Sequence, residues 1–139
     1  MGDELRVFEL RLESVLRGPD NELVDVACER LGEGGWEPYS LRMTGPPFVA
    51  FAYTVFACQL AYLRMNAAER GLGVDRVRGH FRMATTAWVV DEIEAEFWMH
   101  VHAGRASDDD LAFIVERMRG CPISRNLPAA RKQTHLHVA

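Results

Sequence analysis

The chain contains 139 residues, of which 48% are hydrophobic and 26% are charged. These values predict one globular domain that covers residues 1–139. The formal net charge of −4 argues against nucleic acid as a partner, because proteins bind phosphate backbones through basic surfaces. The N-terminus is acidic and carries no export signal, and the three cysteines fit reactive thiols in a reducing compartment, so we expect a cytoplasmic protein.

The first part of the chain predicts a β-hairpin. Residues 5–16 alternate between apolar and charged side chains, as a half-buried strand does, and residues 22–30 alternate in the same way. Residues 18–21 between them form a turn, because Pro19 presets its φ and Asn21 tolerates turn conformations. Residues 36–43 are predicted as a third strand, which Pro38 weakens because it cannot donate a hydrogen bond.

A long apolar helix is predicted to follow, from residue 46 to about residue 70, with Gly71 as its C-terminal cap. Residues 46–63 contain only Thr54 and Gln59 as clearly polar side chains, which reaches the lower limit of a membrane span. The rest of the chain is amphipathic and the segment is rich in Ala, so we expect a core helix buried on every side. A chain this small cannot surround such a helix completely, so we expect a second subunit to help cover it.

The remaining segments complete an α+β pattern. Residues 74–83 and 94–103 alternate as strands, and residues 84–93 extend one strand or the other. Ser107 and Asp110 predict a capped start for a helix that Gly120 ends. Pro122 fits the first position of a short helix, and residues 131–138 alternate as a last strand.

Two cysteines carry the chemistry that the sequence suggests. Cys121 is expected at the N-cap of the short helix, where free N–H groups stabilise a thiolate. Cys58 lies inside the apolar helix, where burial alone raises its pKa and makes it inert. A buried free cysteine is often only a small core residue, and Cys28 on the second strand is interpreted in that way.

The segments around both cysteines resemble the OsmC/Ohr family, the osmotically inducible protein C and organic hydroperoxide resistance proteins. The resemblance rests on Ala57-Cys58 in the long helix, on residues 67–72 before a basic alternating strand, and on residues 121–127, which begin Cys-Pro-Ile-Ser. It extends over residues 47–138. It implies an OsmC-like α+β fold in the order βββ-α-ββ-α-β, with a long buried central helix and an intertwined homodimer. No cofactor, nucleic acid or membrane is expected.

The resemblance also implies an activity. Family members reduce organic hydroperoxides, so Cys58 would be the peroxidatic cysteine and Cys121 the resolving cysteine. A Cys58 sulfenic acid would condense with Cys121 to a disulfide. A small dithiol, often lipoyl-linked, would then reduce this disulfide.

One position departs from the family pattern. Active members carry a Glu ten residues before the peroxidatic cysteine, and this chain has Phe48 there. That Glu holds an Arg from the first hairpin turn against the thiolate, and Arg17 stands at the matching place. Phe48 and Phe51 are instead expected to line an apolar substrate pocket near Cys58. The departure favours an alternative, a non-catalytic member of the fold that binds a small ligand or senses redox state.

Two His-x-His pairs, His100 with His102 and His135 with His137, each place two imidazoles on one face of a strand. No third ligand is set by spacing, so we predict surface histidines and no metal. The basic residues at positions 76, 78, 80 and 82 are interpreted as a solvated strand face.

Overall fold

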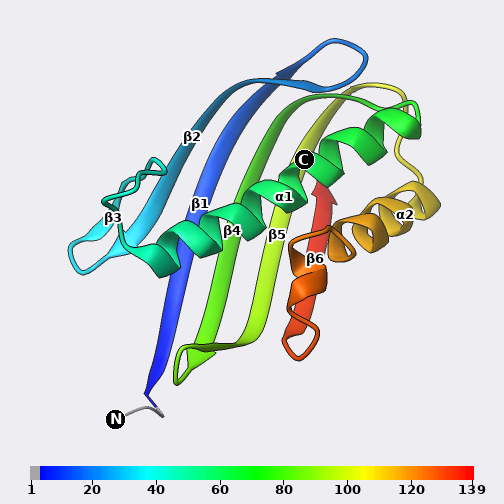
Figure 1. The fold of residues 1–139 in the computed structure, drawn as a ribbon. Helices are drawn as coiled ribbons and strands as arrows, with labels where there is room; N and C mark the ends of the chain where they lie inside the picture. Colours follow the sequence, from blue (N-terminus) through cyan, green and yellow to red (C-terminus); the bar gives the residue numbers. More distant parts are fainter. Residues whose placement is uncertain (1–3) are drawn as a thin grey trace.

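The structure of the protein is a computed structural model that describes residues 4–139. One six-stranded sheet forms the first layer, and two α-helices form the second layer on one face of it (Figure 1). The α+β class predicted from the sequence is therefore confirmed. The elements in chain order are β1 Leu5–Arg17, β2 Glu22–Gly32, β3 Gly35–Pro38, α1 Pro47–Glu69, β4 Gly73–Thr86, β5 Val89–Ala103, α2 Asp108–Arg119, the 3₁₀ turn η1 Ser124–Asn126 and β6 Arg131–Val138.

The sheet has the strand order β3-β2-β1-β4-β5-β6. All neighbours are antiparallel except β5 and β6, which are parallel because α2 and η1 form the crossover between them. Along β1, apolar side chains such as Leu10 and Leu12 are buried, whereas the alternate residues Arg11 and Glu13 face away from the helices. The alternation therefore separates an apolar face under the helices from a charged open face.

Helix α1 crosses the apolar face of the sheet and packs on its centre. Phe56 is buried and its ring lies 5.2 Å from that of Phe81 and 5.4 Å from that of Phe97. Gly79 of β4 makes this approach possible, because a Cβ there would lie 2.9 Å from the Phe56 ring. A glycine in the middle of a strand thus sets the distance between the two layers.

Two boundaries differ from the sequence prediction. The third strand ends at Pro38 and does not extend to residue 43, because Pro38 pairs only at the edge of the sheet. Residues 84–93 extend both strands and form a tight hairpin, since Ala87 and Trp88 both adopt positive φ, at 54° and 66°. Two consecutive left-handed residues are typical of a two-residue hairpin turn.

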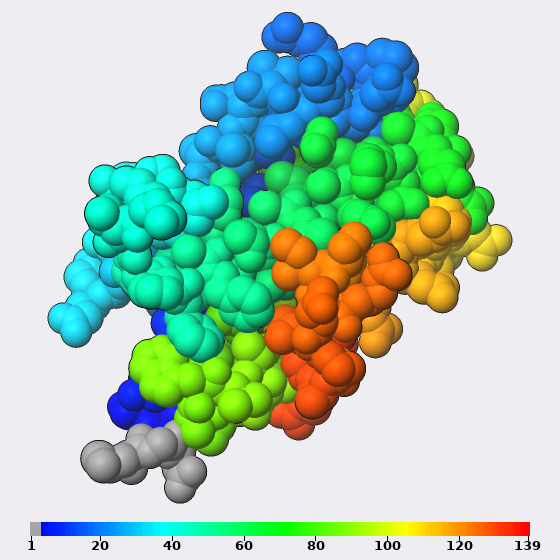
Figure 2. Space-filling view, viewed as in Figure 1, coloured from blue at the N-terminus to red at the C-terminus, as the bar shows by residue number. Residues whose placement is uncertain are grey.

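The prediction that α1 is buried on every side is wrong for a single chain. Only 33% of its most apolar 18-residue window is buried, although the helix is long and apolar enough to cross a membrane by length and composition. Figure 2 shows α1 lying uncovered between β2 and the segment that follows α2. Ala57 and Met65 lie on this uncovered side. One face of the helix therefore has no partner among residues 4–139.

The β1–β2 hairpin is fastened to the end of α1 through Asn21. This residue is fully buried, with φ of 52°, and its amide nitrogen donates to the carbonyl oxygens of Arg64 at 3.2 Å and Leu72 at 3.0 Å. Its side-chain oxygen accepts from the backbone N–H of Val74 at 2.8 Å. Three hydrogen bonds from one side chain thus hold the hairpin turn beside the last turns of the helix.

Asn21→Ala should lower the free energy of unfolding by about 2–3 kcal/mol, because it leaves buried backbone groups unpaired. Chemical denaturation measures the loss. Asp20→Ala, a change at the exposed neighbour in the same turn, is the matched control and should change stability by less than about 0.5 kcal/mol. Equal effects of the two substitutions would contradict the role given to Asn21.

Candidate functional site

The fold brings Cys58 and Cys121 together. Cys58 lies in the middle of α1 and is partly buried, whereas Cys121 follows α2 and is fully buried. Cys121 lies close enough to Cys58 to raise the pKa of its thiol, and all three cysteines of the chain are free thiols. Two residues that are distant in sequence therefore form one thiol pair.

The packing of α2 against α1 places Cys121. Helix α2 begins with a capping box, in which the Ser107 hydroxyl accepts from the Asp110 N–H at 3.1 Å and the Asp110 carboxylate accepts from the Ser107 N–H at 3.0 Å. It ends at Gly120, and the N–H of Cys121 then donates to the carbonyl of Met118 at 3.2 Å. Defined helix ends thus determine where the thiol lies.

The turn after Cys121 differs from the sequence prediction. The 3₁₀ turn η1 has Ile123 as its N-cap, so Cys121 is not the capping residue. Its carbonyl oxygen instead accepts from the N–H of Arg125 at 3.0 Å. The backbone N–H of Ile123 lies near the Cys58 sulfur and lowers the pKa of its thiol. The backbone N–H that was expected to stabilise the Cys121 thiolate therefore acts on the Cys58 thiol instead.

Burial dominates the acidity of Cys58. The pKa of this thiol is raised from its ordinary value of 9.0 to about 11, first by burial and to a smaller extent by the neighbouring Cys121. The hydrogen bond from Ile123 and the positive charge of Arg125 act in the opposite direction and lower the pKa. Within the chain Cys58 is thus a weakly acidic thiol with two stabilising contacts for its thiolate.

Arg17 lies at the hairpin end of β1. It is exposed at the end of β1 and pairs with Glu22 across the hairpin. The hairpin turn contacts α1 at Arg64, six residues and about 9 Å along the helix from Cys58. The role that the family resemblance assigns to Arg17 remains an untested prediction.

Phe48 and Phe51 belong to an aromatic cluster at the start of α1. The Phe48 ring lies 4.9 Å from Trp88, 5.6 Å from Phe8 and 6.2 Å from Phe51. Ten helical residues separate Phe48 from Cys58, a distance of about 15 Å along the axis. The cluster therefore connects α1 to β1 and to the β4–β5 hairpin, and the substrate-pocket role of the two residues stays a prediction.

Two buried polar residues beside the thiols were missed by the sequence analysis. Gln59 is adjacent to Cys58 and Ser124 follows Cys121 by three residues, with exposed fractions of 1% and 0%. Among residues 4–139, the Gln59 carbonyl oxygen and the Ser124 hydroxyl have no hydrogen-bond partner. Unpaired buried polar atoms are costly, so these two mark the surroundings of the thiols as more polar than the sequence pattern indicated.

The third thiol lies elsewhere. Cys28 is buried on β2, opposite Leu12 of β1, and burial with the nearby Glu29 raises its pKa to about 11. It packs in the core, as its place on the apolar face of the strand predicted. The structure thus separates one core cysteine from the thiol pair.

The histidine pairs lie on exposed strand faces and contact acids. His100 Nδ1 lies 2.6 Å from Asp75 Oδ1, and His137 Nε2 lies 2.7 Å from Glu96 Oε2. His137 also stacks on Trp98 at 5.6 Å. Within the described part of the chain, no group of three or more His, Cys, Asp or Glu side chains could hold a metal ion.

Two of the larger hollows of the surface lie on the open face of the sheet. Two hollows of about 720 and 620 Å³ share Arg78 and Trp98 in their lining. A small apolar slot of about 70 Å³ lies between α1 and β2, lined by residues that include Tyr53, Ala57 and Arg64. Neither Cys58 nor Cys121 lines any of these three hollows.

The protein combines a mixed six-stranded sheet with two helices on one face, and Cys58 and Cys121 lie where the longer helix meets the segment after the shorter one. This arrangement was compared with those of known proteins. A comparison with protein-family profiles gave no match, and a comparison with curated proteins gave no relative. Solved structures do match. An OsmC-like protein from Mycoplasma pneumoniae superimposes with a TM-score of 0.57 at 13% identity, over 99% of this chain and 96% of that one.

A second solved structure is an OsmC-like hydroperoxide resistance protein from Jannaschia sp. CCS1. Its TM-score is 0.51 at 17% identity, and the match covers 88% of this chain and 87% of that one. The chain therefore has the fold of OsmC-like proteins, as the resemblance around its two cysteines implied.

Among the three thiols, Cys58 should react first with iodoacetamide, because Cys28 and Cys121 are buried. Its rate should rise with pH toward about pH 11, since the raised pKa keeps the thiol protonated at neutral pH. Peptide mass spectrometry after short labelling between pH 7 and 10 measures the order. Preferential labelling of Cys121 would contradict the burial described above.

Proposed function

We propose that the protein is a thiol-dependent peroxidase that reduces organic hydroperoxides in the response to oxidative stress. The observation that supports this most directly is the proximity of Cys121 to Cys58, which raises the pKa of the Cys58 thiol. A peroxidatic thiol needs a second thiol within reach, so that its oxidised form is captured as a disulfide before it is oxidised further. The OsmC-like fold supports the same reading.

In the proposed reaction, the Cys58 thiolate attacks the distal oxygen of the hydroperoxide. The O–O bond breaks, the organic part leaves as an alcohol after it takes up a proton, and Cys58 becomes a sulfenic acid. The Cys121 sulfur then attacks the Cys58 sulfur, a water molecule leaves and a disulfide forms. An external dithiol, for example a lipoyl group, reduces the disulfide and restores both thiols.

The acidity of Cys58 sets the rate in this mechanism. With a pKa of about 11, roughly one molecule in 10⁴ carries the thiolate at pH 7. This population supports slow turnover unless a further contact lowers the pKa. The raised pKa of Cys58, together with Phe48 in place of the family Glu, favours a second candidate function. In this second function the protein is a non-catalytic OsmC-like protein that binds a small ligand or senses redox state.

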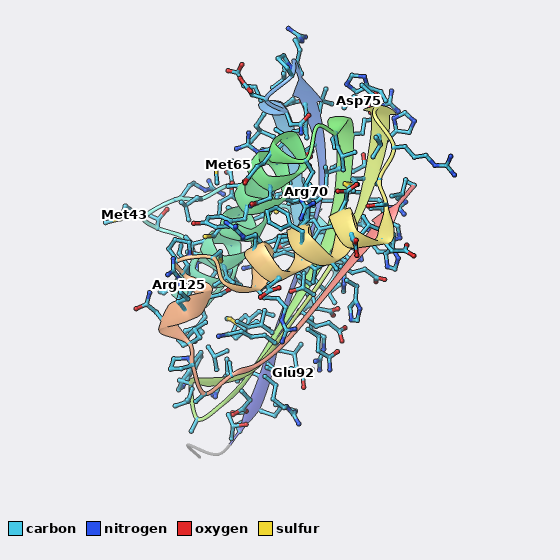
Figure 3. The ribbon with its side chains drawn as sticks, turned by 90° about the vertical axis from the view of Figure 1, so that its right-hand side faces the viewer. Met43, Met65, Arg70, Asp75, Glu92 and Arg125 are labelled. Carbon is cyan, nitrogen blue, oxygen red and sulfur yellow. The ribbon has the colours of Figure 1, made fainter. Side chains whose placement is uncertain are left out.

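We further propose that a second copy of the chain covers the open face of α1. This face carries small or apolar side chains such as Ala57 and Met65, and the latter is 53% exposed. Figure 3 shows Met43 and Met65 on the same side of the molecule, and Met43 is fully exposed. An apolar surface of this kind in a small chain is typical of an obligate interface. We place this homodimer in the cytoplasm.

The reduced protein should consume cumene hydroperoxide in the presence of dihydrolipoamide. Cys58→Ser should abolish turnover, because it removes the attacking sulfur. Cys121→Ser should still react once and leave a sulfenic acid on Cys58, which dimedone labels. Peroxide consumption and mass spectrometry of the labelled protein measure both outcomes.

Cys28→Ala is the matched control, since it removes a buried thiol that lies outside the pair. It should retain the turnover of the unmodified protein. Wild-type protein that consumes no peroxide with any dithiol would favour the binding or sensing function. Turnover that survives in Cys58→Ser would show that the pair is not the site of reaction.

The dimer leads to a prediction of its own. Ala57→Glu should produce monomers or unfolded chains at micromolar concentration, because it places a charge in the apolar interface. Ala112→Glu, the same substitution at an exposed alanine of α2, is the matched control and should remain dimeric. Sedimentation velocity measures the outcome. A wild-type protein that sediments as a folded monomer would contradict the proposal.

A further inference from the structure

The open face of the sheet carries a groove that is formed by the hollows of about 720 and 620 Å³. Both hollows are lined by Glu13, Ala27, Arg78 and Trp98. These four residues form a row across β2, β1, β4 and β5, because Glu13 is the Cα partner of Ala27 and of Arg78, and Arg78 is the Cα partner of Trp98. The two hollows therefore meet over one row of side chains, and their volumes are in the range of small-molecule sites.

The smallest side chain of the row lies between larger neighbours. Ala27 has Asp25 and Glu29 on the same face of β2, and these two residues line the first and the second hollow respectively. Beyond the row, the Trp36 ring lies 4.4 Å from the Arg11 guanidinium, which pairs with Glu29 at 2.7 Å. The groove thus has a low floor at Ala27 and a wall at Trp36 that is held by charged neighbours.

The opposite wall of the groove is the ring of Trp98. The Arg78 guanidinium lies 4.6 Å from this ring, and the His137 ring stacks on it at 5.6 Å. His137 is held in turn by Glu96, since its Nε2 lies 2.7 Å from Glu96 Oε2. Both Trp36 and Trp98 are only partly buried, so each offers apolar ring surface that is already fixed in place.

The centre of the groove holds an acid and a base that are not paired with each other. Glu13 and Arg78 are Cα partners, yet within the described part of the chain neither takes part in an ion pair. Asp25 and Arg76, which line the larger hollow, form no ion pair among residues 4–139 either. The groove therefore presents charges of both signs to a ligand.

We propose that this groove binds a zwitterionic α-amino acid with an aromatic side chain. Its carboxylate accepts hydrogen bonds from the Arg78 guanidinium, and its ammonium group donates to the Glu13 carboxylate. Cα partners on antiparallel strands lie about 5 Å apart, so the two charged groups on one ligand carbon reach both side chains. The aromatic side chain lies on the ring surface of Trp36 or Trp98.

Charge complementarity selects this class of ligand over its neighbours. An organic anion pairs with Arg78 but brings its charge close to Glu13, and an organic cation meets Arg78 in the same way. The groove lies on the face of the sheet away from the helices, so neither the thiol pair nor the proposed second copy on α1 occupies it. The inference therefore goes beyond the proposed function and does not rest on it.

Three matched probes test the charge requirement. L-Phenylalanine carries both charges, phenylpropionate lacks the ammonium group and phenethylamine lacks the carboxylate. Trp36 and Trp98 are two of the three tryptophans of the chain, so tryptophan fluorescence reports binding, and none of the probes contributes to it. L-Phenylalanine should change the fluorescence saturably in the low millimolar range, and each analogue should bind about three- to tenfold more weakly.

Crossed variants assign each charge of the ligand to one residue. Glu13→Gln should weaken L-phenylalanine and phenethylamine about three- to tenfold and leave phenylpropionate unweakened, because only the ammonium group loses its partner. Arg78→Gln should weaken L-phenylalanine and phenylpropionate and leave phenethylamine unweakened. Ala27→Phe should fill the groove and abolish binding of all three probes, while the alkylation rate of Cys58 stays unchanged.

Arg82→Gln and Glu94→Gln are the matched controls, because both residues lie on the same strands as the row and outside the lining of the groove. Both variants should bind L-phenylalanine as the wild type does. A wild-type protein whose fluorescence shows no saturable change would overturn the inference. Tighter binding of either analogue than of L-phenylalanine, or unchanged affinity in both Glu13→Gln and Arg78→Gln, would overturn it as well.

Discussion

The contact between the middle of α1 and the segment after α2 is the interaction on which the site depends. It brings together two thiols that the sequence separates by the second half of α1, two strands and α2. The contact requires that α2 ends at Gly120 and that α1 stays pressed on the sheet through Phe56 and Gly79. Stability and chemistry are thus coupled, since a shift of either helix separates the sulfurs.

Much of the fold could be predicted from local patterns. Alternation identified β1, β2 and β6, and the capping box at Ser107 identified the start of α2, because these signals act within a few residues. The end of β3 and the β4–β5 hairpin could not be predicted in the same way. Their boundaries depend on pairing across the sheet and on two left-handed residues, Ala87 and Trp88, that carry no glycine signal.

The thiol pair itself was expected from the resemblance around Cys58 and Cys121, whereas its electrostatics were not. The residues that act on Cys58 are Ile123, through its backbone, and Arg125, and neither has a pattern that marks it in advance. Arg17 and Phe48 were placed by analogy with the family, and Phe48 lies ten helical residues, about 15 Å along the axis, before Cys58.

The central claim is that Cys58 and Cys121 act as one redox pair. The most direct test adds one equivalent of an organic hydroperoxide to the fully reduced protein and records the intact mass with the number of free thiols. The account predicts a loss of about 2 Da, a fall from three thiols to one, and a Cys58–Cys121 bridge in the peptide map. An unchanged mass with three free thiols, or a bridge that contains Cys28, would contradict it.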